Sequence, residues 1–98
     1  MKKSINVYEF ASWFAEHRPN NFSPIGRLEL FEMLTSYEDD TREEIEFDPI
    51  AFCCEYREYE NMEEFWLDYD RKDFPDEDSI MDATVYWSFG DSFIIQVF

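Results

Sequence analysis

The chain has 98 residues and carries 24 Asp or Glu against eight Lys or Arg, which gives a formal net charge of −16 at pH 7. Proteins that contact nucleic acid need clustered Lys and Arg, so this balance argues against direct DNA or RNA binding. The aromatic share of 20% argues against a disordered chain, because highly charged disordered segments are poor in aromatic residues. The length predicts a single domain over residues 1–98.

The charge is concentrated in the middle of the chain. Residues 38–78 contain eighteen Asp or Glu against four Lys or Arg, so this stretch carries −14 of the total charge of −16. Solubility needs a net charge of only roughly 2–8 in a small domain, and self-repulsion weakens a compact state that carries more. We therefore expect the acidic residues to serve a function, with solubility or a salt-rich habitat as the alternative explanation.

Two helices are predicted before this acidic stretch. Residues 6–17 show apolar side chains at helical spacing, with Asn6 as the N-cap and a Glu three residues later. Ser23 and Pro24 predict the start of a second helix that runs to about Tyr37, because Ser is a good N-cap and Pro is favoured in the first turn. The short loop between them predicts a helical hairpin. The side chains expected in the core of the first helix are Val7, Phe10, Ala11 and Phe14. In the second helix the expected apolar face consists of Ile25, Leu28, Phe31 and Leu34 or Thr35, and it is widened by Leu30, Met33 and Tyr37.

The acidic stretch itself is predicted to alternate between loops and short elements. Residues 41–49 are predicted as a loop or a short edge segment, because Pro49 is tolerated only at a sheet edge. Residues 50–57 alternate in the pattern of a strand, and residues 61–70 are predicted as a short helix with Asn61 as its N-cap. In that helix the late acidic residues lie at the unfavourable C-terminal end, which suggests a role other than stability.

The C-terminal part is predicted to close the fold with a hairpin. Residues 73–82 form an acidic loop with one helical turn at 79–82, and residues 84–89 and 92–98 alternate as two strands. Gly90 with the following Asp is a suitable two-residue turn between these strands. Together these elements predict an α+β fold in the order α-α-β-α-β-β, with a three-stranded antiparallel sheet packed against helices.

No catalytic, cofactor-binding or metal-binding set is predicted. Cys53 and Cys54 are interpreted as small buried side chains of a strand in a reducing cytoplasm, and His17 as an exposed residue at a helix end. The acidic runs lack the central Gly of an EF-hand, so carboxylates would bind divalent ions only weakly and incidentally. The chain shows no apolar run of signal-peptide or membrane-spanning length, which predicts a cytoplasmic protein. Because it also shows no nucleophile with a matching base and no Gly-rich phosphate loop, we expect that it is not an enzyme and has no cofactor.

The stretch EEIEFDPIAFCCEYREYENMEEFWLDYD and the C-terminal SFIIQVF resemble a group of small acidic accessory proteins encoded by phages and mobile elements. The similarity covers roughly residues 24–98, and some proteins of this kind act as anti-CRISPR or anti-restriction factors. In them a Gly often follows the acidic-Thr turn, where this chain has Arg42. The resemblance implies an inhibitor of a bacterial defence system that works in the host cell.

The charge pattern adds a mechanism, which is mimicry of DNA. Duplex DNA presents one negative charge per about 1.7 Å of its axis, and a small rigid fold with exposed carboxylates offers a comparable density. The predicted partner is a basic nucleic-acid-binding protein, with a CRISPR effector favoured and a restriction enzyme as the alternative. The alternative function for the chain is that of an interaction module that does not mimic DNA. The chain is expected to act as a monomer or weak dimer. Trp66 is interpreted as a core residue, and Tyr59 as either a core residue or an exposed anchor. The predicted partner-binding residues are Glu38, Asp39, Asp40, Glu43, Glu44, Glu46, Asp48, Glu58, Glu60, Glu63, Glu64, Asp68, Asp70, Asp73, Asp76, Glu77 and Asp78.

Overall fold

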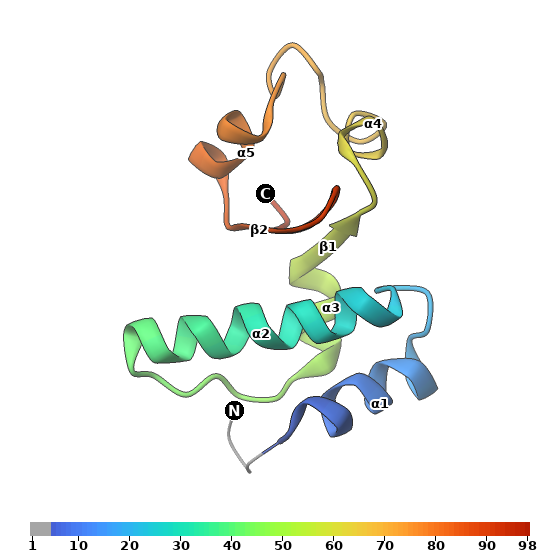
Figure 1. Ribbon diagram of the computed structural model, residues 1–98, viewed down its shortest axis with the longest axis vertical. Coiled ribbons are helices and arrows are strands. Elements are labelled where there is room, and N and C mark those ends of the chain that lie inside the picture. The colour runs from blue at the N-terminus through green and yellow to red at the C-terminus, as the bar shows by residue number, and fades with distance from the viewer. Residues whose placement is uncertain (1–4) are drawn as a thin grey trace. The chain divides into compact units, whose positions relative to one another are not determined.

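The computed structural model describes residues 5–98, which contain five helices and three strands (Figure 1). The chain forms two compact units that divide between Cys53 and Cys54. The predicted α+β class is confirmed, including a three-stranded antiparallel sheet with helices packed against it. That the chain is one domain stays a prediction. Among the described residues, no helix is both long enough and apolar enough to cross a membrane.

The first unit is built on α1 (Val7–His17) and α2 (Pro24–Thr41), which contact each other. Figure 1 shows the two helices joined by a short loop. Both helices start where their cap residues predicted. The Asn6 side chain accepts a hydrogen bond from the backbone N–H of Glu9 at 2.9 Å, and the Ser23 hydroxyl accepts one from the Gly26 N–H at 2.9 Å. These bonds satisfy N–H groups that the first helical turn leaves without an intrahelical partner.

A cluster of Phe side chains holds the first unit together. The ring of Phe10 lies 5.1 Å from that of Phe14 and 5.3 Å from that of Phe31, in the tilted and edge-on arrangements that aromatic pairs prefer. The predicted core face of α2 was wrong in part, because Ile25 is 64% exposed and Leu28 is 44% exposed. The buried side chains of this unit are Phe10, Phe14, Phe22, Leu30, Met33, Leu34 and Phe52.

The strand predicted over residues 50–57 is mostly a helix. Here α3 (Pro49–Glu55) begins after Asp48, whose side chain accepts from the Ala51 N–H at 3.2 Å and whose carbonyl accepts from the Phe52 N–H at 3.1 Å. A capping side chain followed by Pro marks a helix start, as Ser23 and Pro24 do for α2, and this signal outweighed the alternation of apolar residues. Only the last two residues of the predicted strand are extended.

The helix also changes the interpretation of the two cysteines. On α3 they are neighbours around the helix rather than residues on opposite faces of a strand. Cys53 is half-buried and Cys54 is exposed, and neither forms a disulfide. The prediction that both are buried core residues is therefore wrong.

The second unit contains the sheet, formed by β1 (Tyr56–Tyr59), β2 (Tyr86–Phe89) and β3 (Ser92–Gln96). The strand order is β1-β3-β2 and both pairings are antiparallel. The predicted hairpin between β2 and β3 is confirmed. Gly90 adopts a φ of 68° in its turn, a conformation that glycine reaches without the steric cost of a Cβ atom.

Two short helices, α4 (Met62–Phe65) and α5 (Glu77–Ala83), pack on one face of this sheet. The helix predicted over 61–70 is wrong beyond its first turn, since the chain continues in turns after Phe65. Trp66 packs against the core and its indole N–H donates to the Phe74 carbonyl at 2.8 Å, so its interpretation as a core residue is confirmed. The core cluster consists of Tyr59, Phe65, Ile80, Phe93 and Ile95.

Candidate partner-binding surface

The acidic residues predicted to bind a partner lie at the surface of both units. Of the seventeen, fourteen are exposed, and Glu38, Glu58 and Glu64 are half-buried. These acidic residues nevertheless differ in whether they stabilise the fold. Some cap helices or hold turns, whereas others have no such role and are the better candidates for a partner.

In the first unit the candidates form one continuous stretch, residues 38–48, which we name the α2 acidic stretch. Glu38, Asp39 and Asp40 occupy the last turn of α2, which contains no basic residue. The C-terminal end of a helix carries a partial negative charge, so three carboxylates there are destabilising. The helix then ends at Arg42, whose φ of 58° is left-handed and strained for a residue with a side chain.

The loop that follows turns its acidic residues outward. Ile45 and Phe47 are half-buried, and the ring of Phe47 lies 5.7 Å from that of Phe10. The Ile45 N–H donates to the Glu38 carboxylate at 2.7 Å, which ties the loop to the end of α2. The exposed carboxylates of this loop alternate with the half-buried Ile45 and Phe47. They belong to Glu44, Glu46 and Asp48.

In the second unit many candidate carboxylates stabilise helix starts. The Asp76 side chain accepts from the Ser79 N–H at 2.9 Å and caps α5, while Glu77 and Asp78 occupy the first turn. The first turn of α4 likewise holds two Glu residues. Negative charge at a helix N-terminus is favourable, so these residues have a structural explanation independent of any partner.

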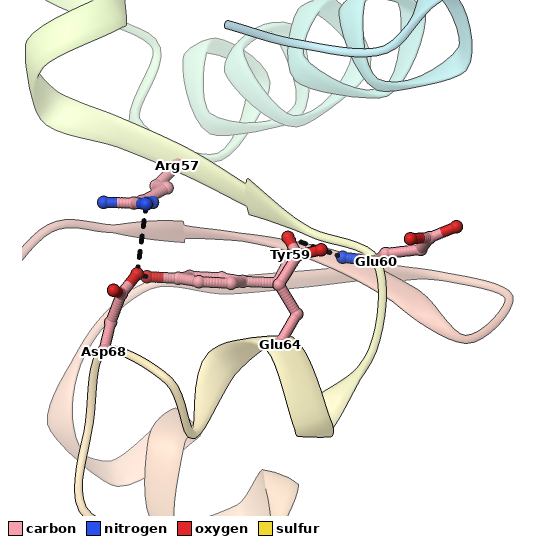
Figure 2. A network of polar contacts seen from close by, with 5 residues as sticks. All are labelled: Arg57, Tyr59, Glu60, Glu64 and Asp68. Atoms are coloured by element: carbon pink, nitrogen blue, oxygen red, sulfur yellow. Dashed lines mark hydrogen bonds and ion pairs between the residues drawn. The ribbon is translucent and has the colours of Figure 1, made fainter.

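A polar network fixes one further candidate, Asp68, to β1 (Figure 2). The Tyr59 hydroxyl donates to its carboxylate at 2.9 Å, and an Arg57 guanidinium nitrogen lies 3.1 Å from the same oxygen. Tyr59 is only 1% exposed, so of its two interpretations the core residue is confirmed and the exposed anchor is wrong. Burial, followed by the hydrogen bond to Asp68, raises the pKa of the Tyr59 phenol well above its ordinary value.

This network also overturns the reason given for singling out the late acidic residues of the predicted third helix. Asp68 and Asp70 lie after α4 has ended, so they do not stand at the end of a longer helix. Asp68 anchors β1, and the Asp70 carboxylate accepts from the Lys72 N–H at 2.8 Å within a turn. Acidic residues do stand at the unfavourable C-terminal end of a helix in this chain, but in the last turn of α2.

A hollow of about 530 Å³ in the second unit brings together candidates that are distant in sequence. Glu60 and Glu77 line it, together with Asp91, which the sequence presented only as a turn residue. The Glu60 N–H donates to the Glu64 side chain at 3.4 Å (Figure 2), and the Ser92 hydroxyl donates to the Glu60 carbonyl at 3.1 Å. Throughout residues 5–98, no group of three or more His, Cys, Asp or Glu is placed to hold a metal ion.

Comparison with known proteins identifies no relative, since no protein-family model, no curated protein and no solved structure matches the chain. The resemblance to small phage-encoded accessory proteins therefore stays a prediction. The site must be interpreted from its own chemistry, which is that of exposed carboxylates. Such groups attract Lys and Arg side chains of a partner and repel nucleic acid.

Proposed function

We propose that the chain is a phage-type inhibitor of a bacterial defence system, which acts in the host cytoplasm as an acidic mimic of DNA. It would occupy the nucleic-acid-binding surface of an effector complex, with a CRISPR effector as the favoured target and a restriction enzyme as the alternative. The proposal assigns the chain no catalytic step and no cofactor.

The observation that carries this proposal is the α2 acidic stretch. Asp39 and Asp40 lie at the negative end of α2, where a carboxylate weakens the helix. Glu43, Glu44 and Glu46 are exposed on the loop that follows. Charge that served only solubility could be placed at helix N-termini, as it is in α5, at no such cost. The primary contacts that we propose are Asp39, Asp40, Glu43, Glu44 and Glu46, with the exposed carboxylates of residues 58–78 as secondary contacts.

The test is a titration of the chain into a purified CRISPR effector that holds fluorescent target DNA. The proposal predicts displacement of the DNA at a molar ratio near one, because both ligands compete for the same Lys and Arg residues. Displacement should weaken with added salt, since screening over about 10 Å at 0.1 M ionic strength reduces attraction between exposed charges. Inhibition of cleavage with DNA still bound would contradict mimicry, and a parallel titration of restriction enzymes separates the two targets.

A second candidate function is an interaction module that does not imitate nucleic acid. The observation in its favour is an open apolar groove between α1 and α2, beside which Tyr8 is 78% exposed. Binding of this kind would tolerate changes of charge in the α2 acidic stretch and would fail when the aromatic side chain is removed. Replacing Tyr8 with Ala, and separately Glu44 with Lys, distinguishes the two functions in the same titration.

A further inference from the structure

The groove between α1 and α2 is a feature that the acidic surface does not explain. Its volume is about 420 Å³, and it lies wholly within the first unit. Leu28, which lines it, was predicted to face the core, yet it is 44% exposed; Tyr8, also in the lining, is 78% exposed. The complete lining is Val7 and Tyr8 from α1 and Leu28, Phe31, Glu32 and Thr35 from α2.

The groove has the dimensions and chemistry of a helix-binding site. Residues 28, 31, 32 and 35 follow the i, i+3, i+4, i+7 pattern, so its α2 wall runs for about 10 Å, or two helical turns. Single exposed apolar residues are ordinary, but several that share one hollow mark an interaction surface. An amphipathic helix inserts apolar side chains at the same repeat, so two turns of such a helix match the length of the groove.

Charge decides which helix fits. Glu32 stands exposed in the wall of the groove, Glu9 is exposed in the first turn of α1, and residues 1–53 hold eleven Asp or Glu against five Lys or Arg. A second copy of the chain, which also carries −16, would be repelled from this surface. A helix with Lys and Arg beside its apolar residues is complementary both to the apolar lining of the groove and to the negative charge around it.

We propose that this groove binds an amphipathic, basic helix of the partner protein, with apolar side chains in the groove and Lys or Arg residues against Glu32 and the surrounding carboxylates. The inference rests on the proposed function, because it gives the same basic partner a second point of contact. Apolar anchors within a polar surround supply most of the binding energy of typical interfaces. The acidic residues then steer the partner, and the groove holds it.

The test uses the full chain and two synthetic helical peptides of equal charge. One peptide carries Leu at positions i, i+4 and i+7 with Lys at the exposed positions, and the other has Ser in place of each Leu. We expect the Leu peptide to bind at least about tenfold more tightly by fluorescence anisotropy. Backbone amide NMR shifts should change along the groove-lining residues 7–8 and 28–35. Equal binding of the two peptides, or shifts confined to residues 38–48, would overturn the proposal.

Pairs of matched variants test whether the peptide binds in the groove. Leu28→Ala should weaken the Leu peptide about tenfold, while Ile25→Ala, which alters an exposed apolar residue of the same helix outside the groove, should leave affinity unchanged. Glu32→Lys should weaken binding more than Glu16→Lys, which makes the same charge change on an exposed residue outside the lining. Equal effects within either pair would contradict a groove contact. Circular dichroism confirms that each variant is folded.

Failure of this inference is distinguishable from failure of the proposed function. If the chain displaces target DNA and Leu28→Ala displaces it equally well, mimicry stands and the groove has no part in it. If the Leu peptide binds in the groove while DNA is never displaced, the groove contact stands and mimicry fails.

Discussion

Tyr59, Arg57 and Asp68 show how a single carboxylate can serve the fold rather than a partner. The Tyr59 ring is buried between β1 and the helices, and its hydroxyl reaches the Asp68 carboxylate at 2.9 Å. Arg57 approaches the same oxygen, but it is 59% exposed and Asp68 is 37% exposed. An exposed ion pair contributes roughly 0–1 kcal/mol, so the hydrogen bond from the buried phenol is the stronger of the two contacts.

We predict that Tyr59→Phe lowers the free energy of unfolding by about 1–2 kcal/mol, because a hydrogen bond to a charged acceptor is lost while the ring stays in place. Urea unfolding followed by circular dichroism measures the change. Tyr8→Phe removes a hydroxyl from an exposed ring and should have no effect. Arg57→Ala should lower the free energy of unfolding by less than Tyr59→Phe does. A larger loss for Arg57→Ala would contradict the conclusion that the hydrogen bond is the stronger contact.

The same phenol predicts a dependence of stability on pH. The pKa of Tyr59 is raised in the folded protein, by burial first and by its hydrogen bond to Asp68 second. An unfolded phenol ionises near pH 10, so the stabilisation is complete below about pH 10 and declines as the pH rises further. We expect the difference in unfolding free energy between the wild type and Tyr59→Phe to shrink from pH 9 to pH 11 in urea titrations. A constant difference would contradict this linkage.

Arg42 is the other single residue with a measurable consequence. Its φ of 58° lies in the left-handed region, which costs a residue with a Cβ atom about 1–2 kcal/mol. We predict that Arg42→Gly raises the free energy of unfolding by about 0.5–1 kcal/mol, part of the gain being offset by the greater freedom of glycine in the unfolded chain. Arg42→Ala is the control in thermal denaturation, because it removes the side chain and retains the strain.

At the scale of the elements, helix starts could be predicted from sequence wherever the cap signal was followed. Asn6 and Ser23 located α1 and α2 to the residue, and Asn61 located α4. The same kind of signal, Asp48 before a Pro, marks the start of α3, but the alternation of apolar residues after it favoured a strand. Alternation over so few residues does not distinguish a strand from a short helix, whereas a capped Pro does.

The last turn of α2 gives a prediction at this scale. Asp40→Lys should raise the free energy of unfolding by about 0.3–1 kcal/mol at low ionic strength, because a cation replaces an anion at the negative end of the helix. Asp78→Lys makes the same charge change in the first turn of α5 and should lower it by a similar amount. Urea unfolding of both variants tests the difference in sign, and a gain in stability from both would indicate that only total charge matters.

At the scale of the whole molecule, composition predicted that the carboxylates are exposed but not which of them stabilise the fold. A net charge of −16 on 98 residues required most carboxylates to be exposed, and fourteen of the seventeen candidates are. Which of them are structural depends on contacts that only the fold creates, such as Tyr59 with Asp68 and Glu60 beside Glu77. The groove was not predicted because its apolar residues have the same helical spacing as a core face.

The central claim is that the position of the charge, and not its amount, makes the chain an inhibitor. Two triple variants separate these, since each changes the net charge from −16 to −13 through exposed residues. The test variant combines Asp40→Asn, Glu44→Gln and Glu46→Gln in the α2 acidic stretch. The control combines Glu16→Gln, Glu55→Gln and Asp82→Asn, which lie outside the candidate surface.

The most direct measurement is the concentration of each variant that displaces half of the fluorescent target DNA from the effector at fixed salt. Three lost charge contacts of about 0.5–1 kcal/mol each predict that the test variant needs roughly tenfold or more of the wild-type concentration. The control should displace DNA at a concentration within about twofold of the wild type, since it alters only the long-range attraction that salt screens. Equal losses in the two variants would contradict a specific role for the α2 acidic stretch.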